Sequence, residues 1–127
     1  GLAAAVRALG KDFERDVGIS TSVETMPIGD LLPDDAKTAM YRVIQEALTN
    51  ITKYADAKNV SISLTTSRRR VQLIITDDGI GFDTKKTFKG LGLGLRNMQE
   101  RIDSFGGQIT IKSAQNAGTK IRVTLPI

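Results

Sequence analysis

Asp77-Asp78-Gly79-Ile80-Gly81-Phe82 is a glycine-containing stretch, and a second one follows at Gly90-Leu91-Gly92-Leu93-Gly94-Leu95. The two stretches lie between segments of different periodicity. The first stretch follows an apolar, β-branched run over 71–76 that is typical of a strand. The second opens a run over 96–105 with helical spacing of its apolar residues. Glycines allow the backbone to approach a ligand closely, and the unpaired N–H groups at a helix start bind phosphate. This order of elements therefore predicts a nucleotide site.

Helix-like and strand-like patterns alternate through the rest of the chain. Apolar spacing predicts helices over 2–17, 35–55 and 93–105. Alternation and β-branched residues predict strands over 19–26, 60–66, 71–76, 108–112 and 120–125. Asp34 or Asp35 is expected to cap the second helix. No repeat or interdomain linker is visible, so residues 1–127 are expected to form a single domain.

Composition narrows the classes of function. The chain is 40% hydrophobic and 25% charged, as expected of a globular domain, and has no run of about 20 apolar residues. It has no cysteine, which excludes disulfides and thiolate metal sites, and no histidine, which excludes a histidine base or acceptor within these residues. The net charge of +4 suits either a nucleotide phosphate or an ordinary basic surface. Because Gly1 is not an initiator residue, we expect a piece of a longer protein.

The predicted helix over 35–55 carries two stripes of different chemistry. The apolar stripe is expected to face the core and consists of Met40, Val43, Ile44, Ala47 and Ile51. A polar stripe runs alongside it and consists of Glu46, Asn50, Lys53 and Tyr54. An amide oxygen can bind Mg²⁺, a carboxylate can accept a proton and an ammonium group can meet phosphate. The same pattern also fits a solvated helix face, and that alternative remains open for any single pair of residues.

A carboxylate at the end of a strand can distinguish one base from another. Asp77 can accept a hydrogen bond from an exocyclic amine such as that of adenine, and guanine has no amine at that position. Lys85, Lys86 and Lys89 add positive charge before the glycine triplet. Taken alone, the first stretch also fits an ordinary Asp-Gly turn, and the second a flexible loop before a helix. The spacing does not match a P-loop or a dinucleotide-binding motif.

Taken together, these stretches resemble the ATP-binding domains of sensor histidine kinases. Gln45-Glu46-Ala47-Leu48-Thr49-Asn50 resembles the N box of that family, and 77–82 resembles its first glycine box. The segment 90–101 is similar to the second glycine box, in the form found in nitrate-sensor-like kinases, and Gly118-Thr119 is similar to the last box. The resemblance covers nearly the whole chain and is strongest over 41–124.

The resemblance implies an α+β fold of the Bergerat type, a two-layer α/β sandwich in which a mixed, mostly antiparallel sheet has helices on one face. It implies ATP and Mg²⁺ as cofactors and transfer of the ATP γ-phosphoryl group to a histidine on a separate dimerisation domain. It also implies a response regulator with a helix-turn-helix output as partner, a cytoplasmic location within a parent that can be membrane-anchored, and no direct contact with nucleic acid or membrane.

The resemblance further implies a role for each matching residue. Glu46 is the expected catalytic residue, and Asn50 the expected Mg²⁺ ligand. Asp77 is expected to read adenine, with Thr119 supporting that end of the nucleotide. The remaining expected ATP-binding residues are Lys53, Tyr54, Gly79, Gly81, Phe82, Gly90, Gly92, Leu93, Gly94 and Leu95.

Two departures and two alternatives accompany this interpretation. Tyr54 occupies a place where the family usually has histidine, so one phosphate contact is in question, and the acceptor helix is absent from this sequence. One alternative is a stand-alone kinase of the same fold that phosphorylates serine on a partner, such as an anti-sigma factor. The other is a non-enzymatic module that binds nucleotide or nucleic acid.

Overall fold

The computed structural model describes residues 1–81 and 92–127, and for residues 92–95 it describes the backbone alone. The expected site residues Phe82 and Gly90 lie outside the described residues. In chain order, the described elements are α1 (Leu2–Val17), β1 (Ser20–Thr25), α2 (Asp34–Asn50), the π-helix η1 (Ile51–Ala55), β2 (Asn59–Ser67), β3 (Arg70–Asp77), α4 (Gly92–Ser104), β4 (Gln108–Ser113) and β5 (Thr119–Pro126).

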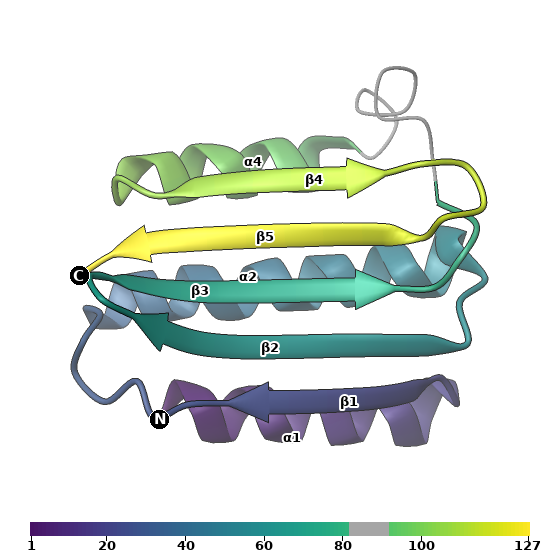
Figure 1. The fold of residues 1–127 in the computed structure, drawn as a ribbon, viewed down its shortest axis with the longest axis horizontal. Helices are drawn as coiled ribbons and strands as arrows, with labels where there is room; N and C mark the ends of the chain where they lie inside the picture. Colours follow the sequence, from purple (N-terminus) through teal and green to yellow (C-terminus); the bar gives the residue numbers. More distant parts are fainter. Residues whose placement is uncertain (82–91) are drawn as a thin grey trace.

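The described strands form one mixed sheet with the order β1-β2-β3-β5-β4. β1 pairs with β2 in parallel, and the other neighbouring strands pair antiparallel. The helices α1, α2 and α4 lie behind this sheet in Figure 1, so that one face is covered and the other is open. The prediction of an α+β, two-layer fold with a mostly antiparallel sheet is confirmed.

The core lies between the sheet and the helices because strand residues alternate between the two faces. Val60, Ile62 and Leu64 of β2 are at most 3% exposed, whereas the intervening residues are only partly buried. The buried residues of the neighbouring strands are Val71, Leu73, Ile75, Ile121, Val123 and Leu125. Burying one such side chain contributes about 1.5–3 kcal/mol. The apolar stripe predicted for α2 is buried along its whole length, which confirms its assignment to the core.

Two predictions for the second helix are wrong in detail. Neither Asp34 nor Asp35 caps it, because Pro33 is the N-cap residue and its carbonyl accepts the backbone N–H of Lys37 at 3.0 Å. Both aspartates lie in the first turn, where negative charge is favourable at the positive end of the helix dipole. The α-helix ends at Asn50, and Ile51–Ala55 continue as a π-helix. The predicted α-helical stripe therefore does not extend to Lys53 and Tyr54.

No helix among residues 1–81 and 92–127 combines the length and apolar character needed to cross a membrane.

Candidate functional site

The elements that carry the expected site residues meet at one end of the sheet. β3 ends and β5 begins at this end, and α2 passes into η1 beside them (Figure 1). Asp77 is aligned with Val60 on one neighbouring strand and with Thr119 on the other. Because aligned residues point to the same face, and Val60 is buried on the helix-covered face, Asp77 and Thr119 also face the helix layer.

The carboxylate of Asp77 accepts hydrogen bonds from the backbone and can accept a further one. The backbone N–H of Gly79 donates to its Oδ1 at 2.8 Å, and the backbone N–H of Thr119 also favours the ionised form. Burial has the largest effect and raises the pKa of Asp77 above its ordinary value, with a further increase from the charge of Asp78. An ionised carboxylate offers about four lone-pair sites. It can therefore accept another hydrogen bond from a ligand amine in this half-buried position.

Asp78 has a structural role that the sequence interpretation missed. Its Oδ1 accepts the backbone N–H groups of Lys58 and Asn59, each at 2.9 Å, and its Oδ2 accepts the Asn59 side-chain amide at 2.8 Å. The bonds with Asn59, first that of its side chain, lower the pKa of Asp78 to about 2, with help from the Lys58 N–H. The signal was available, because the hairpin predicted over 60–76 brings residues 58–59 beside residue 78. Asp78 therefore ties the turn to β2.

The glycines of this turn are required by close backbone contacts. A Cβ added to Gly79 would lie 2.1 Å from the carbonyl oxygen of Ala55, the last residue of η1. That same oxygen accepts the N–H of Ile80 at 2.7 Å. Gly81 has φ +65°, and an added Cβ would lie 2.1 Å from the Ala114 carbonyl oxygen. The turn is therefore fixed against η1 on one side and against the β4–β5 connection on the other.

Thr119 lies in a small polar cluster next to Asp77. Its hydroxyl is 2.8 Å from the Ser113 hydroxyl, which also donates to the Gly118 carbonyl at 3.0 Å. Asp77, Ser113, Gly118 and Thr119 line part of an open cavity of about 340 Å³ at the end of the sheet, whose wall also includes Thr76, Lys112 and Lys120. The structure thus brings Asp77, Gly79, Gly81 and Thr119 together, as one expects if they act on one ligand.

The polar residues of α2 and η1 occupy different environments. Glu46 and Asn50 are half-buried one helical turn apart, whereas Lys53 is exposed and Tyr54 is 58% exposed on the π-turn. Within the described residues, no group of three acidic, histidine or cysteine side chains could form a protein metal site. Mg²⁺ commonly takes only one or two protein oxygens together with phosphate and water. The Asn50 side-chain oxygen is a suitable single ligand.

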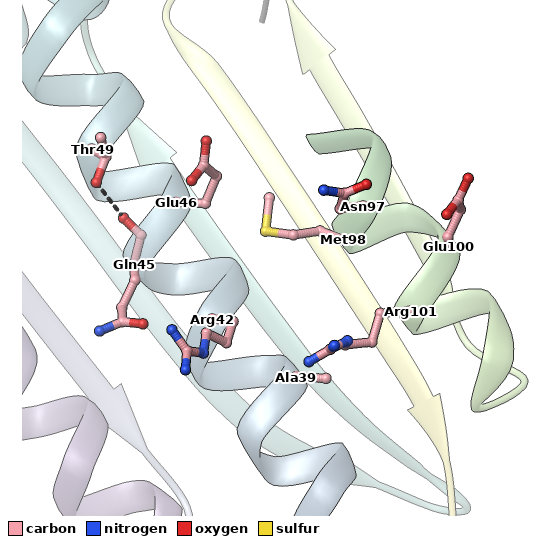
Figure 2. A pocket seen from close by; sticks show the side chains of 9 residues that line it. All are labelled: Ala39, Arg42, Gln45, Glu46, Thr49, Asn97, Met98, Glu100 and Arg101. Carbon is pink, nitrogen blue, oxygen red and sulfur yellow. Dashed lines mark hydrogen bonds between the residues drawn. The ribbon is translucent and has the colours of Figure 1, made fainter. Parts of the chain in front are cut away.

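Glu46 lines a pocket of about 500 Å³ between α2 and α4. Figure 2 shows this pocket, which is lined by Ala39, Arg42, Gln45, Glu46, Thr49, Asn97, Met98, Glu100 and Arg101. The sequence predicts a catalytic role for Glu46 but assigns no role to Arg42 and Arg101. Their positions become meaningful only once the packing of α4 against α2 is known.

α4 begins at Gly92, so the backbone of Gly92, Leu93, Gly94 and Leu95 forms its first turn. The first backbone N–H groups of a helix have no partner within the helix. The predicted phosphate contact falls on the first turn of this helix and stays a prediction.

The comparisons with known proteins match this arrangement. Residues 35–127 match the family described as histidine kinase-, DNA gyrase B- and HSP90-like ATPase. The chain belongs to this family. Over 128 residues it is 40% identical to the sensor histidine kinase MctS of Rhizobium johnstonii, covering 99% of this chain and 28% of MctS. The oxygen sensor histidine kinase NreB of Staphylococcus carnosus is 37% identical over 127 residues, covering 100% of this chain and 37% of NreB.

A solved structure gives the same fold for this ATPase-family domain. The histidine kinase domain of the blue-light-activated histidine kinase from Erythrobacter litoralis matches with a TM-score of 0.84 at 18% identity, covering 98% of this chain and 60% of that chain. The resemblance to sensor histidine kinases is therefore confirmed. The chain spans only 28% of MctS and 37% of NreB, so the activity of a whole protein is a separate question.

Proposed function

We propose that this chain is the ATP-binding catalytic domain of a bacterial sensor histidine kinase and a single domain of a longer protein. The observation that carries the proposal is the placement of Asp77 beside Thr119, with the turn at Gly79 packed against η1. This is a partly buried carboxylate with spare acceptor capacity, next to a helix that carries Glu46 and Asn50. The 40% identity to a sensor histidine kinase over nearly the whole chain supports the same conclusion.

Each group has a distinct task in binding ATP. Asp77 accepts the exocyclic amine of adenine, and Thr119 supports the same end of the nucleotide. The turn containing Gly79 and Gly81 lets backbone approach the ligand, with Phe82 following it. The start of α4, Gly92 to Leu95, donates N–H groups to phosphate, and Gly90, Lys53 and Tyr54 complete the phosphate contacts.

The proposed reaction moves the γ-phosphoryl group from ATP to a histidine nitrogen. A bond forms between that nitrogen and phosphorus, while the bond from phosphorus to the bridging oxygen breaks and ADP leaves. Glu46 accepts or polarises the N–H proton of the attacking imidazole. Asn50 would hold Mg²⁺ through its side-chain oxygen, and the ion would supply positive charge at the phosphate oxygens. Because little covalent chemistry is required of the protein, the rate depends on positioning and electrostatics.

The partners follow from the same proposal. The chain contains no histidine, so the acceptor must lie on another segment, which we assign to a dimerisation domain of the parent kinase. A response regulator with a helix-turn-helix output would then receive the phosphoryl group. We place this reaction in the cytoplasm, with no direct contact between this domain and nucleic acid or membrane.

Phosphotransfer in trans tests this function. The chain is mixed with Mg²⁺, γ-labelled ATP and the part of MctS outside its matched segment as acceptor. Label that is lost in acid and kept in alkali indicates phosphohistidine and supports the proposal. Asn50→Ala is the matched inactive control. Acid-stable label on serine would instead favour the stand-alone serine kinase, and nucleotide binding without any transfer would favour a binding module.

A further inference from the structure

The groove between α2 and α4 has two ends of different chemistry. Glu46 and Asn97 lie at one end, whereas Arg42, Arg101 and Ala39 lie at the other (Figure 2). Glu46 is one helical turn from Asn50, so its end of the groove is next to the expected metal and phosphate. The arginine end has no assigned role in nucleotide binding.

Arg42 and Arg101 line the groove without a carboxylate partner among the residues that the structure describes. Both are exposed, and the ion pairs formed within residues 1–81 and 92–127 involve Arg15 and Lys37 instead. Figure 2 shows Arg101 extending from α4 toward α2, Arg42 lying along α2 with its guanidinium directed away from α4 in this view, and Glu100 pointing away from α2. Glu46 follows Arg42 by four residues, yet no ion pair joins them within 4 Å. Guanidinium groups bind carboxylates well through planar, paired hydrogen bonds, so this end of the groove suits an anionic side chain.

The spacing along α2 gives the position of that side chain. Arg42, Glu46 and Asn50 lie on successive turns, and each step of four residues advances about 6 Å along the axis. Arg42 is thus about 12 Å along the axis from Asn50, which is too far to share its metal and phosphate, and Glu46 lies between them. A helix lying along the groove would place one residue at Glu46 and another, one turn away, at the arginines.

We propose that Arg42 and Arg101 bind a carboxylate side chain located one helical turn from the acceptor histidine on the partner helix. This contact positions the histidine at Glu46. Arg42 and Arg101 are then positioning residues that set which acceptor is phosphorylated, and Glu46 retains the chemical role. The inference rests on the proposed kinase function and names the recognition element of its protein substrate.

The test compares Arg42→Gln, Arg101→Gln and the double variant with Arg122→Gln. Arg122 is exposed on β5 between buried Ile121 and Val123, so it lies on the open face of the sheet. Its replacement by glutamine therefore removes the same positive charge at a site outside the groove. The acceptor is the part of MctS outside its matched segment. Transfer kinetics, calorimetric binding of this acceptor and calorimetric binding of ATP are measured for each variant.

We expect each groove variant to raise the KM for the acceptor by about fivefold, with kcat and ATP affinity unchanged, since an exposed ion pair contributes up to about 1 kcal/mol. Arg122→Gln should match the wild type. Arg101→Glu should regain transfer with an acceptor in which a carboxylate one turn from the histidine is replaced by arginine. Higher salt should weaken wild-type acceptor binding more than binding by the double variant.

Three results would overturn the inference: unchanged acceptor KM in the double variant, a loss confined to kcat or ATP affinity, or no acceptor binding by the wild-type chain. Failure of the proposed function gives a different pattern. In that case the wild-type chain binds no ATP, or binds acceptor through the arginines without transferring phosphate. The latter result would keep the docking contact while removing the kinase assignment.

Discussion

Replacing Asp77 with asparagine preserves the shape of the side chain and changes what it offers to a ligand. The ionised carboxylate has two acceptor oxygens, one of which accepts the N–H of Gly79 at 2.8 Å. Asparagine keeps one acceptor and converts the other position into an NH₂ donor. If the oxygen stays with Gly79, the new donor faces the adenine amine, which is also a donor. The variant therefore loses the proposed contact and gains a repulsive one.

The expected size of the effect follows from this exchange. A hydrogen bond to a charged group contributes about 1.5–3 kcal/mol, and each 1.4 kcal/mol is a factor of ten in affinity. ATP affinity should therefore fall by roughly 10- to 150-fold. GTP presents an acceptor at the same position and should lose less, because the new NH₂ group can donate to it. The ratio of ATP to GTP affinity is thus the informative quantity.

Isothermal titration of both nucleotides into the wild-type chain and Asp77→Asn measures that ratio. Asp78→Asn is the matched control, since its carboxylate is engaged with Lys58 and Asn59 and should affect stability without changing base preference. Thermal unfolding verifies that each variant is folded. Unchanged ATP affinity, or equal losses for ATP and GTP, would refute the base-reading role of Asp77.

Four further changes test other parts of the account. Asn50→Ala should abolish the Mg²⁺-dependent part of ATP affinity, measured by titration with and without Mg²⁺, at an unchanged melting temperature. Gly79→Ala should lower the free energy of unfolding in urea by about 1–3 kcal/mol, because its Cβ would lie 2.1 Å from the Ala55 carbonyl oxygen. Tyr54→His should tighten ATP binding in a titration if an imidazolium contacts phosphate. Because the pKa of Asp78 is lowered to about 2, stability should fall as pH drops from 3.8 toward 2, and Asp78→Asn should flatten this slope in urea unfolding at stepped pH.

Each of these has a clear contrary result. Equal ATP affinity of Asn50→Ala with and without Mg²⁺ at the wild-type level would remove that residue from the site. Wild-type stability of Gly79→Ala would show that the turn can shift away from η1. Unchanged ATP affinity in Tyr54→His would show that tyrosine is tolerated where the family usually has histidine. A carboxyl group whose pKa is lowered by folding stabilises the fold at pH values above its ordinary pKa. A steeper loss of stability with falling pH in Asp78→Asn than in the wild type would therefore contradict the expected direction.

Local patterns were sufficient for much of the fold. The apolar spacing of α2 correctly predicted which of its residues are buried, because one face of an amphipathic helix must contact the core. The change to a π-helix after Asn50 was not predicted, since apolar spacing does not reveal an i+5 hydrogen-bond pattern. The N-cap prediction also failed. Aspartates are common N-cap residues, but the helix begins at Asp34 and Pro33 occupies the N-cap position.

Some parts of the site were predicted from the sequence and others were not, because several of its contacts join residues that are far apart in the chain. The alignment of Asp77 with Thr119 confirms that residues from two predicted motifs come together, although their roles in ATP binding remain proposals. The contacts of Asp78 with Lys58 and Asn59 depend on the register of the β2–β3 hairpin, and the arginine end of the groove depends on helix packing. Phe82 and Gly90 stay predictions, as they lie outside the described residues.

The central claim is that this domain binds ATP through adenine recognition and a Mg²⁺-assisted phosphate site. Calorimetric titration of the wild-type chain with ATP and GTP, each with and without Mg²⁺, tests it most directly. We expect micromolar to millimolar ATP binding that is stronger than GTP binding and strengthened by Mg²⁺. A folded chain that binds neither nucleotide, or binds both equally well without any response to Mg²⁺, would contradict it.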